Sequence, residues 1–158
     1  MAESITAQIT ANRKALLGQL SIANGDSFTP AVVEEQRLML NIAGRYPYMQ
    51  LLLGEVTPNG ENNNTEDTPL DYLVLLYDIY NDANATDPEI AYKYRNAVAD
   101  ITKKWFSDMT CGGLAQGTKR ISYDNGAVIP NNKGDLFFVV AVHFEVQVLI
   151  DSLDPYKL

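Results

Sequence analysis

The clearest pattern of hydrophobic and polar positions along the chain covers residues 136–150. Every even-numbered position in this stretch is apolar, whereas the odd-numbered positions begin apolar and turn polar at His143, Glu145 and Gln147. Alternation with a period of two is typical of a β-strand with one buried face. The pattern therefore predicts a long central strand, buried on both faces in its first half and on one face in its second half.

Two other stretches have apolar residues every three or four positions, which places them on one face of a helix. Residues 4–20 are the first, with Ser4 as the expected N-cap. Residues 88–109 are the second, with Asp87 as the expected cap and Cys111-Gly112-Gly113 as the expected stop. The sequence thus predicts at least two amphipathic helices.

Shorter apolar runs predict the remaining strands. Residues 48–53 and 70–80 are largely apolar and bounded by turn-forming or polar residues, which favours interior strands. Residues 118–129 predict a hairpin that turns at Asp124-Asn125-Gly126, because Asn-Gly is a strong turn pair.

Two segments have no clean period. Residues 59–69 are polar and rich in Asn and acidic residues, so they predict a flexible connection, a hairpin loop between two strands. Residues 28–43 fit neither the helical nor the strand period. They leave open a short helix beginning at Thr29-Pro30 and an irregular strand.

The order of these elements is helix, strands, helix, strands, which offers few strand–helix–strand crossovers. We therefore predict an α+β fold, with a mainly antiparallel β-sheet packed by two or three α-helices. The chain has 158 residues, a length typical of one ordinary domain with a real core. We expect a single domain over residues 1–158.

Charge and cysteine content narrow the functional classes. The formal net charge of −8 argues against tight binding to a nucleic-acid backbone, which needs clustered Lys and Arg. The single cysteine, Cys111, excludes an internal disulfide and fits a reducing compartment. No apolar run approaches the roughly 20 residues of a membrane span, and the first residues lack a signal-peptide core.

Ligand-binding motifs are weak. Residues 112–119 resemble a phosphate-binding loop, but Gly117 is followed by Thr118 and then Lys119, which is the wrong order. Asp82, Asn84 and Thr86 have the spacing of a calcium loop, but the glycine and the closing glutamate of that loop are missing. We therefore expect no metal and no cofactor.

Catalytic groups are equally few. His143 is the only histidine, and Glu145 lies two residues further along the same predicted strand. A His-Glu pair is able to do acid–base work, and Cys111 would need His143 as its base. A polar sheet face and a buried cysteine are the commoner explanations. No convincing enzyme site emerges, so we expect a non-enzymatic protein.

The overall order of elements resembles that of the tail terminator, or tail completion, proteins of long-tailed bacteriophages. These proteins join the head to the tail. The resemblance lies in the N-terminal helix of residues 4–20, the proline-marked strand entry Arg45-Tyr46-Pro47-Tyr48-Met49-Gln50-Leu51, the strand of residues 70–80, the packing helix of residues 88–109, and the closing strands of residues 121–130 and 136–150. It covers most of the chain, but it is a resemblance of pattern, without a short motif.

The resemblance implies a structural virion protein, assembled in the host cytoplasm. It would form a ring, commonly a hexamer, on the last ring of tail-tube protein, end tube polymerisation and face the capsid connector or another neck protein. Genomic DNA would pass through its acidic lumen without specific binding. The segment with Glu61, Glu66 and Asp67 is the candidate lumen or inter-ring loop.

Three hypotheses remain. The first is the ring protein of a phage tail or neck, including other neck or connector proteins. The second is a small non-enzymatic binding module, which predicts a discrete cleft and no ring. The third is an enzyme that uses His143 with Glu145 or Cys111, which predicts a concave pocket around His143.

Overall fold

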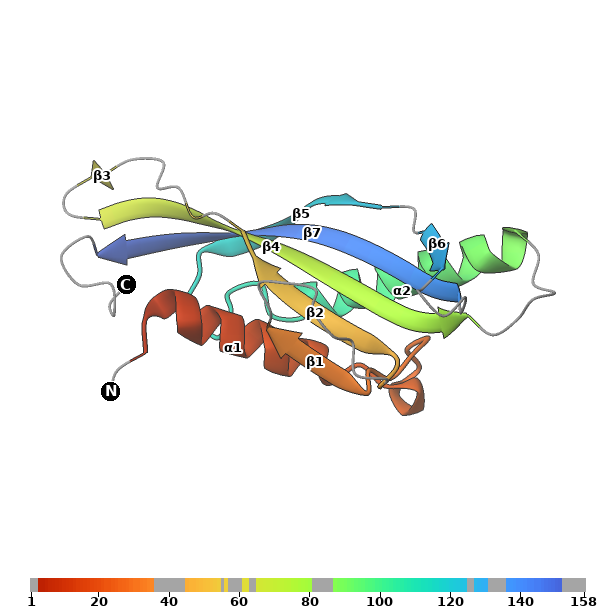
Figure 1. The fold of residues 1–158 in the computed structure, drawn as a ribbon. Coiled ribbons are helices and arrows are strands. Elements are labelled where there is room, and N and C mark those ends of the chain that lie inside the picture. The colour runs from red at the N-terminus through yellow and green to blue at the C-terminus, as the bar shows by residue number, and fades with distance from the viewer. Residues whose placement is uncertain are drawn as a thin grey trace.

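The computed structural model describes residues 3–35, 45–54, 56, 61–62, 65–80, 87–124, 127–130 and 136–151. Figure 1 shows a long twisted sheet, with one helix below it and one behind it in this view. In chain order, the elements are α1 (Ile5–Leu17), a 3₁₀ turn (Ile22–Asn24), β1 (Val32–Glu35), β2 (Tyr48–Leu53), β3 (Glu61–Asn62), β4 (Thr65–Tyr80), α2 (Asp87–Phe106), β5 (Gly117–Tyr123), β6 (Ala127–Pro130) and β7 (Leu136–Asp151).

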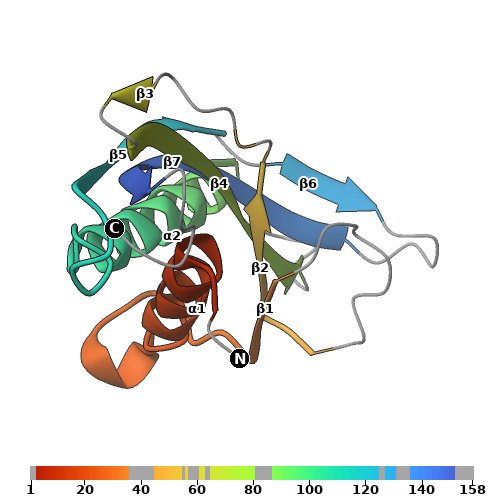
Figure 2. The same ribbon diagram turned by 90° about the vertical axis from the view of Figure 1, so that its left-hand side faces the viewer.

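The strands form one mixed sheet in the order β1-β2-β4-β7-β5, with β3 beside β4 and β6 beside β7. The β1 strand runs parallel to β2, and every other described pair is antiparallel. Both helices lie on the same side of the sheet (Figure 2). The predicted α+β class, with a mainly antiparallel sheet packed by helices, is therefore confirmed.

The centre of the sheet is a long ladder between β4 and β7. It runs without a break from the pair Thr65–Asp151 to the pair Tyr80–Leu136. The even-numbered residues of β7 from Phe138 to Val148 are fully buried against the helices. The predicted long strand is confirmed, with a period of two because alternate side chains face the helical layer. Its predicted burial on both faces in the first half is wrong, because Phe137, Val139 and Ala141 on the other face are only half-buried.

Aromatic side chains join the helices to this ladder. The Trp105 ring on α2 stacks on Phe144 at 4.2 Å between centroids, and Tyr94 stacks on Phe138 at 4.1 Å. On α1, the Thr10 hydroxyl lies 2.9 Å from the Tyr72 hydroxyl of β4. These contacts fix which helix faces which strand. Ser4 caps α1 as predicted, accepting a hydrogen bond from the Ala7 N–H at 3.3 Å.

The sheet face opposite the helices carries a second, smaller apolar cluster. Tyr48, Leu75 and Tyr77 are its buried members, and Val139 and Ala141 from the first half of β7 pack against them in part. We call this face the open face, because no described helix covers it. Among the described residues, no helix is long and apolar enough to cross a membrane.

Several predicted elements were wrong or only partly right. The flexible loop expected over residues 59–69 contains the short strand β3 and the first five residues of β4. Its hairpin character is correct, because β2 and β4, the strands that it connects, pair antiparallel. Thr65 to Pro69 join the ladder because β7 is long enough to pair with them, a contact that their polar sequence does not reveal.

The hairpin expected over residues 118–129 is also wrong. Both β5 and β6 pair with β7, at successive positions along its edge, and not with each other. The Asp124 N–H donates to the Ala141 carbonyl of β7 at 2.9 Å, which continues β5 along that edge. Residues 125–126 of the predicted turn lie outside the described residues.

No helix starts at Thr29-Pro30. The Thr29 hydroxyl instead accepts a hydrogen bond from the Ile22 N–H at 2.9 Å, and the chain then enters β1. The alternative of an irregular strand over residues 28–43 is thus correct for Val32–Glu35, and residues 36–44 lie outside the described part. The α2 helix ends at Phe106, three residues before the predicted end.

Candidate assembly surface along strand β5

The β5 strand is an edge of the sheet. It pairs with β7 on one side, and no strand pairs with its other side among the described residues. Thr118 fixes its beginning, because its hydroxyl accepts a hydrogen bond from Trp105 Nε1 at 2.8 Å and donates to the Glu145 carbonyl at 2.9 Å. From Lys119 to Tyr123 every residue is exposed.

A β-bulge interrupts the strand between Arg120 and Ser122. Bulges of this kind twist an edge strand and limit its indiscriminate pairing with other chains. Large apolar side chains are nevertheless exposed here: Ile121 at the bulge is 45% exposed, Tyr123 is 50% exposed, and Met109 after α2 is 49% exposed. Exposed apolar groups at a sheet edge mark a candidate contact surface.

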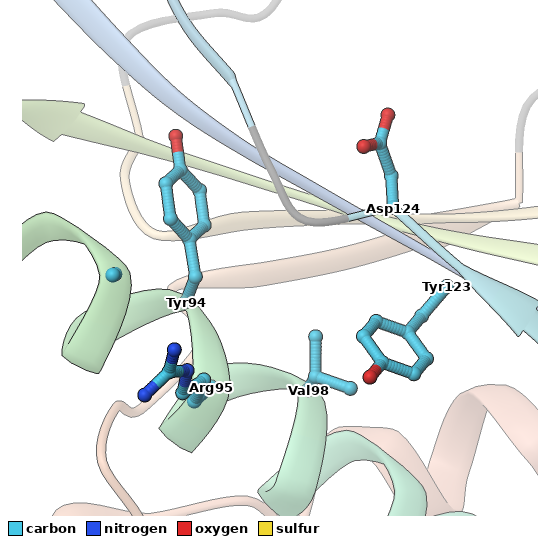
Figure 3. A pocket seen from close by; sticks show the side chains of 6 residues that line it. Tyr94, Arg95, Val98, Tyr123 and Asp124 are labelled. Atoms are coloured by element: carbon cyan, nitrogen blue, oxygen red, sulfur yellow. The ribbon is translucent and has the colours of Figure 1, made fainter.

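Two hollows lie between β5 and α2. The first has a volume of about 180 Å³, and in Figure 3 the Tyr123 ring on β5 lies across from Val98 of α2. The second, about 490 Å³, lies nearer the C-terminal end of α2. We define the β5 edge surface as β5 with the residues that line both hollows: Ala91, Tyr94, Arg95, Val98, Thr102, Phe106, Met109, Thr118, Lys119, Arg120, Tyr123 and Asp124.

The β5 edge surface carries basic residues held by local contacts. The Arg120 guanidinium carbon lies 4.8 Å from the centre of the Tyr123 ring, and its Nη1 donates to the Thr102 hydroxyl at 3.2 Å. Lys119 Nζ forms an ion pair with Glu145 at 2.7 Å. The β5 strand itself carries two basic residues, Lys119 and Arg120, and no acidic residue.

The Glu145 carboxylate is well stabilised in its charged form. The hydrogen bond from Lys119 lowers its pKa below the ordinary value of 4.5, and the hydrogen bond from Gln147 lowers it further. Burial acts in the opposite direction but is outweighed. The Glu145 carboxylate is therefore charged at neutral pH.

The opposite edge of the sheet has the opposite charge. The β1 strand carries Glu34 and Glu35 and no basic residue. Tyr48 donates its hydroxyl proton to the Glu34 carboxylate at 2.8 Å, which holds that side chain over the open face. No strand pairs with the outer side of β1 in the part of the chain that the structure describes.

The three acidic residues predicted to line a lumen lie at one end of the long ladder. Glu61 of β3 is the register partner of Glu66 of β4, and Asp67 is the next residue of β4. The Asp67 side chain is half-buried, and its Oδ1 atom is buried without a hydrogen-bond partner. The structure thus brings the three acids together, on paired strands and not on the predicted loop.

The two residues considered for nucleophilic catalysis are on opposite sides of the sheet. Cys111 is fully buried in the core between the helices and the sheet, where burial raises the pKa of its thiol to about 11. His143 faces the open face, with its Nε2 3.5 Å from Asp71 and beside Glu145. His143 therefore cannot act as the base for Cys111.

The other rejected motifs do not gain support. Gly112 and Gly113 lie in the turn between α2 and β5 with positive φ angles. They come six and seven residues after Phe106, so the helix stop expected at Cys111-Gly112-Gly113 is wrong. Asp82, Asn84 and Thr86, which have the spacing of a calcium loop, lie outside the described residues. Among the described residues, no group of three acidic, histidine or cysteine side chains is placed to hold a metal ion.

Comparison with known proteins does not extend this description. No protein-family model matches the chain, and no curated protein matches it either.

Proposed function

We propose that the chain is a structural subunit that forms a ring at the head-proximal end of a bacteriophage tail. In this role it ends polymerisation of the tail tube and joins the tail to the capsid connector. The observation that carries the proposal is a helix-backed sheet with two unpaired edges in its described part, β1 and β5. Such a subunit is suited to contact copies of itself in a repeating, head-to-tail manner.

The distribution of charge supports the same role. The net charge of −8 and the acidic end of the β4–β7 ladder suit a channel that DNA passes without being held. In the proposed ring, the end with Glu61, Glu66 and Asp67 faces the lumen or a neighbouring ring.

Another neck or connector protein is the alternative with the same physical basis, since it would also form a ring. It differs in its partner. A terminator binds the end of a tail tube, whereas a connector binds the portal side of the neck.

The test is to mix the purified chain with purified tail tubes that lack their terminator, and to examine them by electron microscopy. The proposal expects a closed ring with a central pore at one end of each tube. Tubes that stay bare at both ends, with no ring in the free protein, would refute it. Rings that form in solution but ignore the tubes would favour the connector role.

A further inference from the structure

The two edges that no described strand pairs with are complementary in charge and lie at opposite ends of the sheet. The β5 edge presents Lys119 and Arg120, and the β1 edge presents Glu34 and Glu35. A pairing between two β5 edges, or between two β1 edges, would bring like charges together, which destabilises cross-strand contacts. Only a contact between β5 and β1 of different copies brings opposite charges together.

The faces of the two strands also match. Lys119 is on the open face, because it pairs with Glu145 there. Glu34 is on the same face, because it contacts Tyr48. Arg120 lies on the helical side with Thr102.

The alternation of β1 supplies the matching acid on the helical side. Val33 packs into the core between the helices and the sheet, whereas Val32 packs against the apolar cluster on the open face. Glu35 follows Val33 on the helical side by the period of two. Each cation of β5 therefore has an acidic counterpart on the same face of β1.

We propose that β5 of one copy pairs antiparallel with β1 of the next copy, with Lys119 opposite Glu34. This register places Arg120 opposite Val33 and diagonal to Glu35, close enough for a long side chain to reach. The strand directions agree. In the described sheet β5 and β1 run in opposite directions, so copies rotated about an axis along the strands meet antiparallel.

The proposal rests on the proposed ring function and specifies the contact that builds the ring. A contact between two different edges is heterologous, and it closes into a ring when the rotation per copy divides a full turn. The exposed Ile121 and Tyr123 then lie at the border of the contact, where the next copy shields them from water.

The direct test is a disulfide cross-link between two single variants, Lys119→Cys and Glu34→Cys. Directly opposite residues of antiparallel strands have Cα atoms within the range that a disulfide bridges. We expect covalent dimers mainly in the oxidised mixture and few in either variant alone. The natural chain is the control, because its Cys111 is fully buried.

The second test is charge reversal, followed by light scattering over a range of concentrations. Lys119→Glu or Glu34→Lys alone should weaken self-association ~10-fold or more, and the double variant should restore it. Glu145→Gln is the control for loss of the internal ion pair of Lys119. Tyr48→Phe is the control for the contact made by Glu34.

The outcomes separate this inference from the proposed function. Equal cross-linking in each single variant alone, or no rescue by the double variant, would overturn the edge pairing. Rings that still form in those samples would leave the ring function intact. A chain that stays monomeric even at millimolar concentration and does not cross-link in the mixture would overturn the pairing. Tail tubes that also stay bare would overturn the proposed ring function as well.

Discussion

At the scale of single residues, the most consequential group is the buried Arg13 of α1. Its guanidinium donates to the Trp105 carbonyl at 2.9 Å and to the Asn12 side chain, and it forms an ion pair with Asp108 at 3.2 Å. The side chain is completely buried, and these partners offset the cost of burying a charged group. Arg13 thereby ties α1 to the end of α2 and to the turn that leads into β5.

We predict that Arg13→Met destabilises the protein by about 2–4 kcal/mol, because the Trp105 carbonyl and the Asp108 carboxylate lose their donor. Urea unfolding, followed by the fluorescence of the only tryptophan, measures the change. Lys14→Met, at an exposed position of the same helix, is the matched control and should change the free energy of unfolding little. An Arg13→Met variant as stable as the natural chain would contradict the assigned role.

The carboxylates of Asp108 and Glu145 predict an acid-sensitive fold. Burial alone would raise the pKa of Asp108, but the Gly112 N–H and Arg13 outweigh it, so the pKa lies below its ordinary value of 3.8. Lys119 lowers the pKa of Glu145 below 4.5. The unfolded chain therefore binds these protons at a higher pH than the native chain does.

It follows that their stabilisation is fully present at neutral pH and falls as the pH drops through about 4.5 and below. Urea unfolding at neutral pH and at a series of acidic values measures this. Glu145→Gln should flatten part of the decline. A decline that is the same in the natural chain and in Glu145→Gln would show that this ion pair does not contribute.

Cys111 should be inert in the native state. Its thiol is buried and its pKa is raised to about 11, so little thiolate forms at neutral pH. We expect a thiol reagent to modify it very slowly in buffer and rapidly in urea. Rapid modification of the folded chain would contradict the buried placement.

At the scale of elements, the sequence predicted most accurately the segments whose hydrophobic periodicity follows from the burial of one face. The alternation of residues 136–150 was visible because every second side chain of β7 enters the core. The beginning of β4 was missed because Thr65, Glu66 and Asp67 gain their strand conformation from pairing with the end of β7. Local sequence carries no signal for a partner that lies 80 or more residues away.

The β5 edge surface was missed for a related reason. Lys119, Arg120 and Ile121 have no clean alternation, because a bulge interrupts the strand. The turn signal at residues 124–126 did not identify the partner of either strand, since β7 is long enough to accept both β5 and β6. The only local signal of this surface in the sequence was the mixture of basic and apolar residues in residues 119–123.

Thr118 gives the clearest prediction at this scale. Thr118→Val should destabilise the protein by about 1–3 kcal/mol, because it leaves the buried Trp105 N–H without an acceptor. Thr118→Ser keeps the hydroxyl and is the control. Urea unfolding supplies the free energies, and a shift in tryptophan emission should appear only in Thr118→Val. Equal stability of the two variants would mean that the hydroxyl contributes nothing.

At the scale of the whole molecule, the fold places its functional features at different places around one sheet. The helices cover one face, the charged edges lie at the two ends of the strand order, and the acidic hairpin of β3 and β4 lies at the end of the long ladder. In the proposed ring, this arrangement would give a subunit separate surfaces for its copies and for the channel.

The acidic end supplies a prediction about DNA passage. Neutralising it with Glu61→Gln, Glu66→Gln and Asp67→Asn should leave rings assembled but slow the ejection of DNA from reconstituted particles, because backbone repulsion is lost. Glu3→Gln, Glu89→Gln and Gln19→Lys change the net charge equally at exposed positions outside both sheet edges and are the control. Equal ejection by both triple variants would remove the basis for a lumen at this end.

The proposed ring is best tested by electron microscopy of terminator-free tail tubes mixed with the purified chain, with the chain alone imaged alongside. We expect a closed ring with an open pore capping one end of each tube. Bare tube ends, together with a free chain that forms no ring, would contradict it.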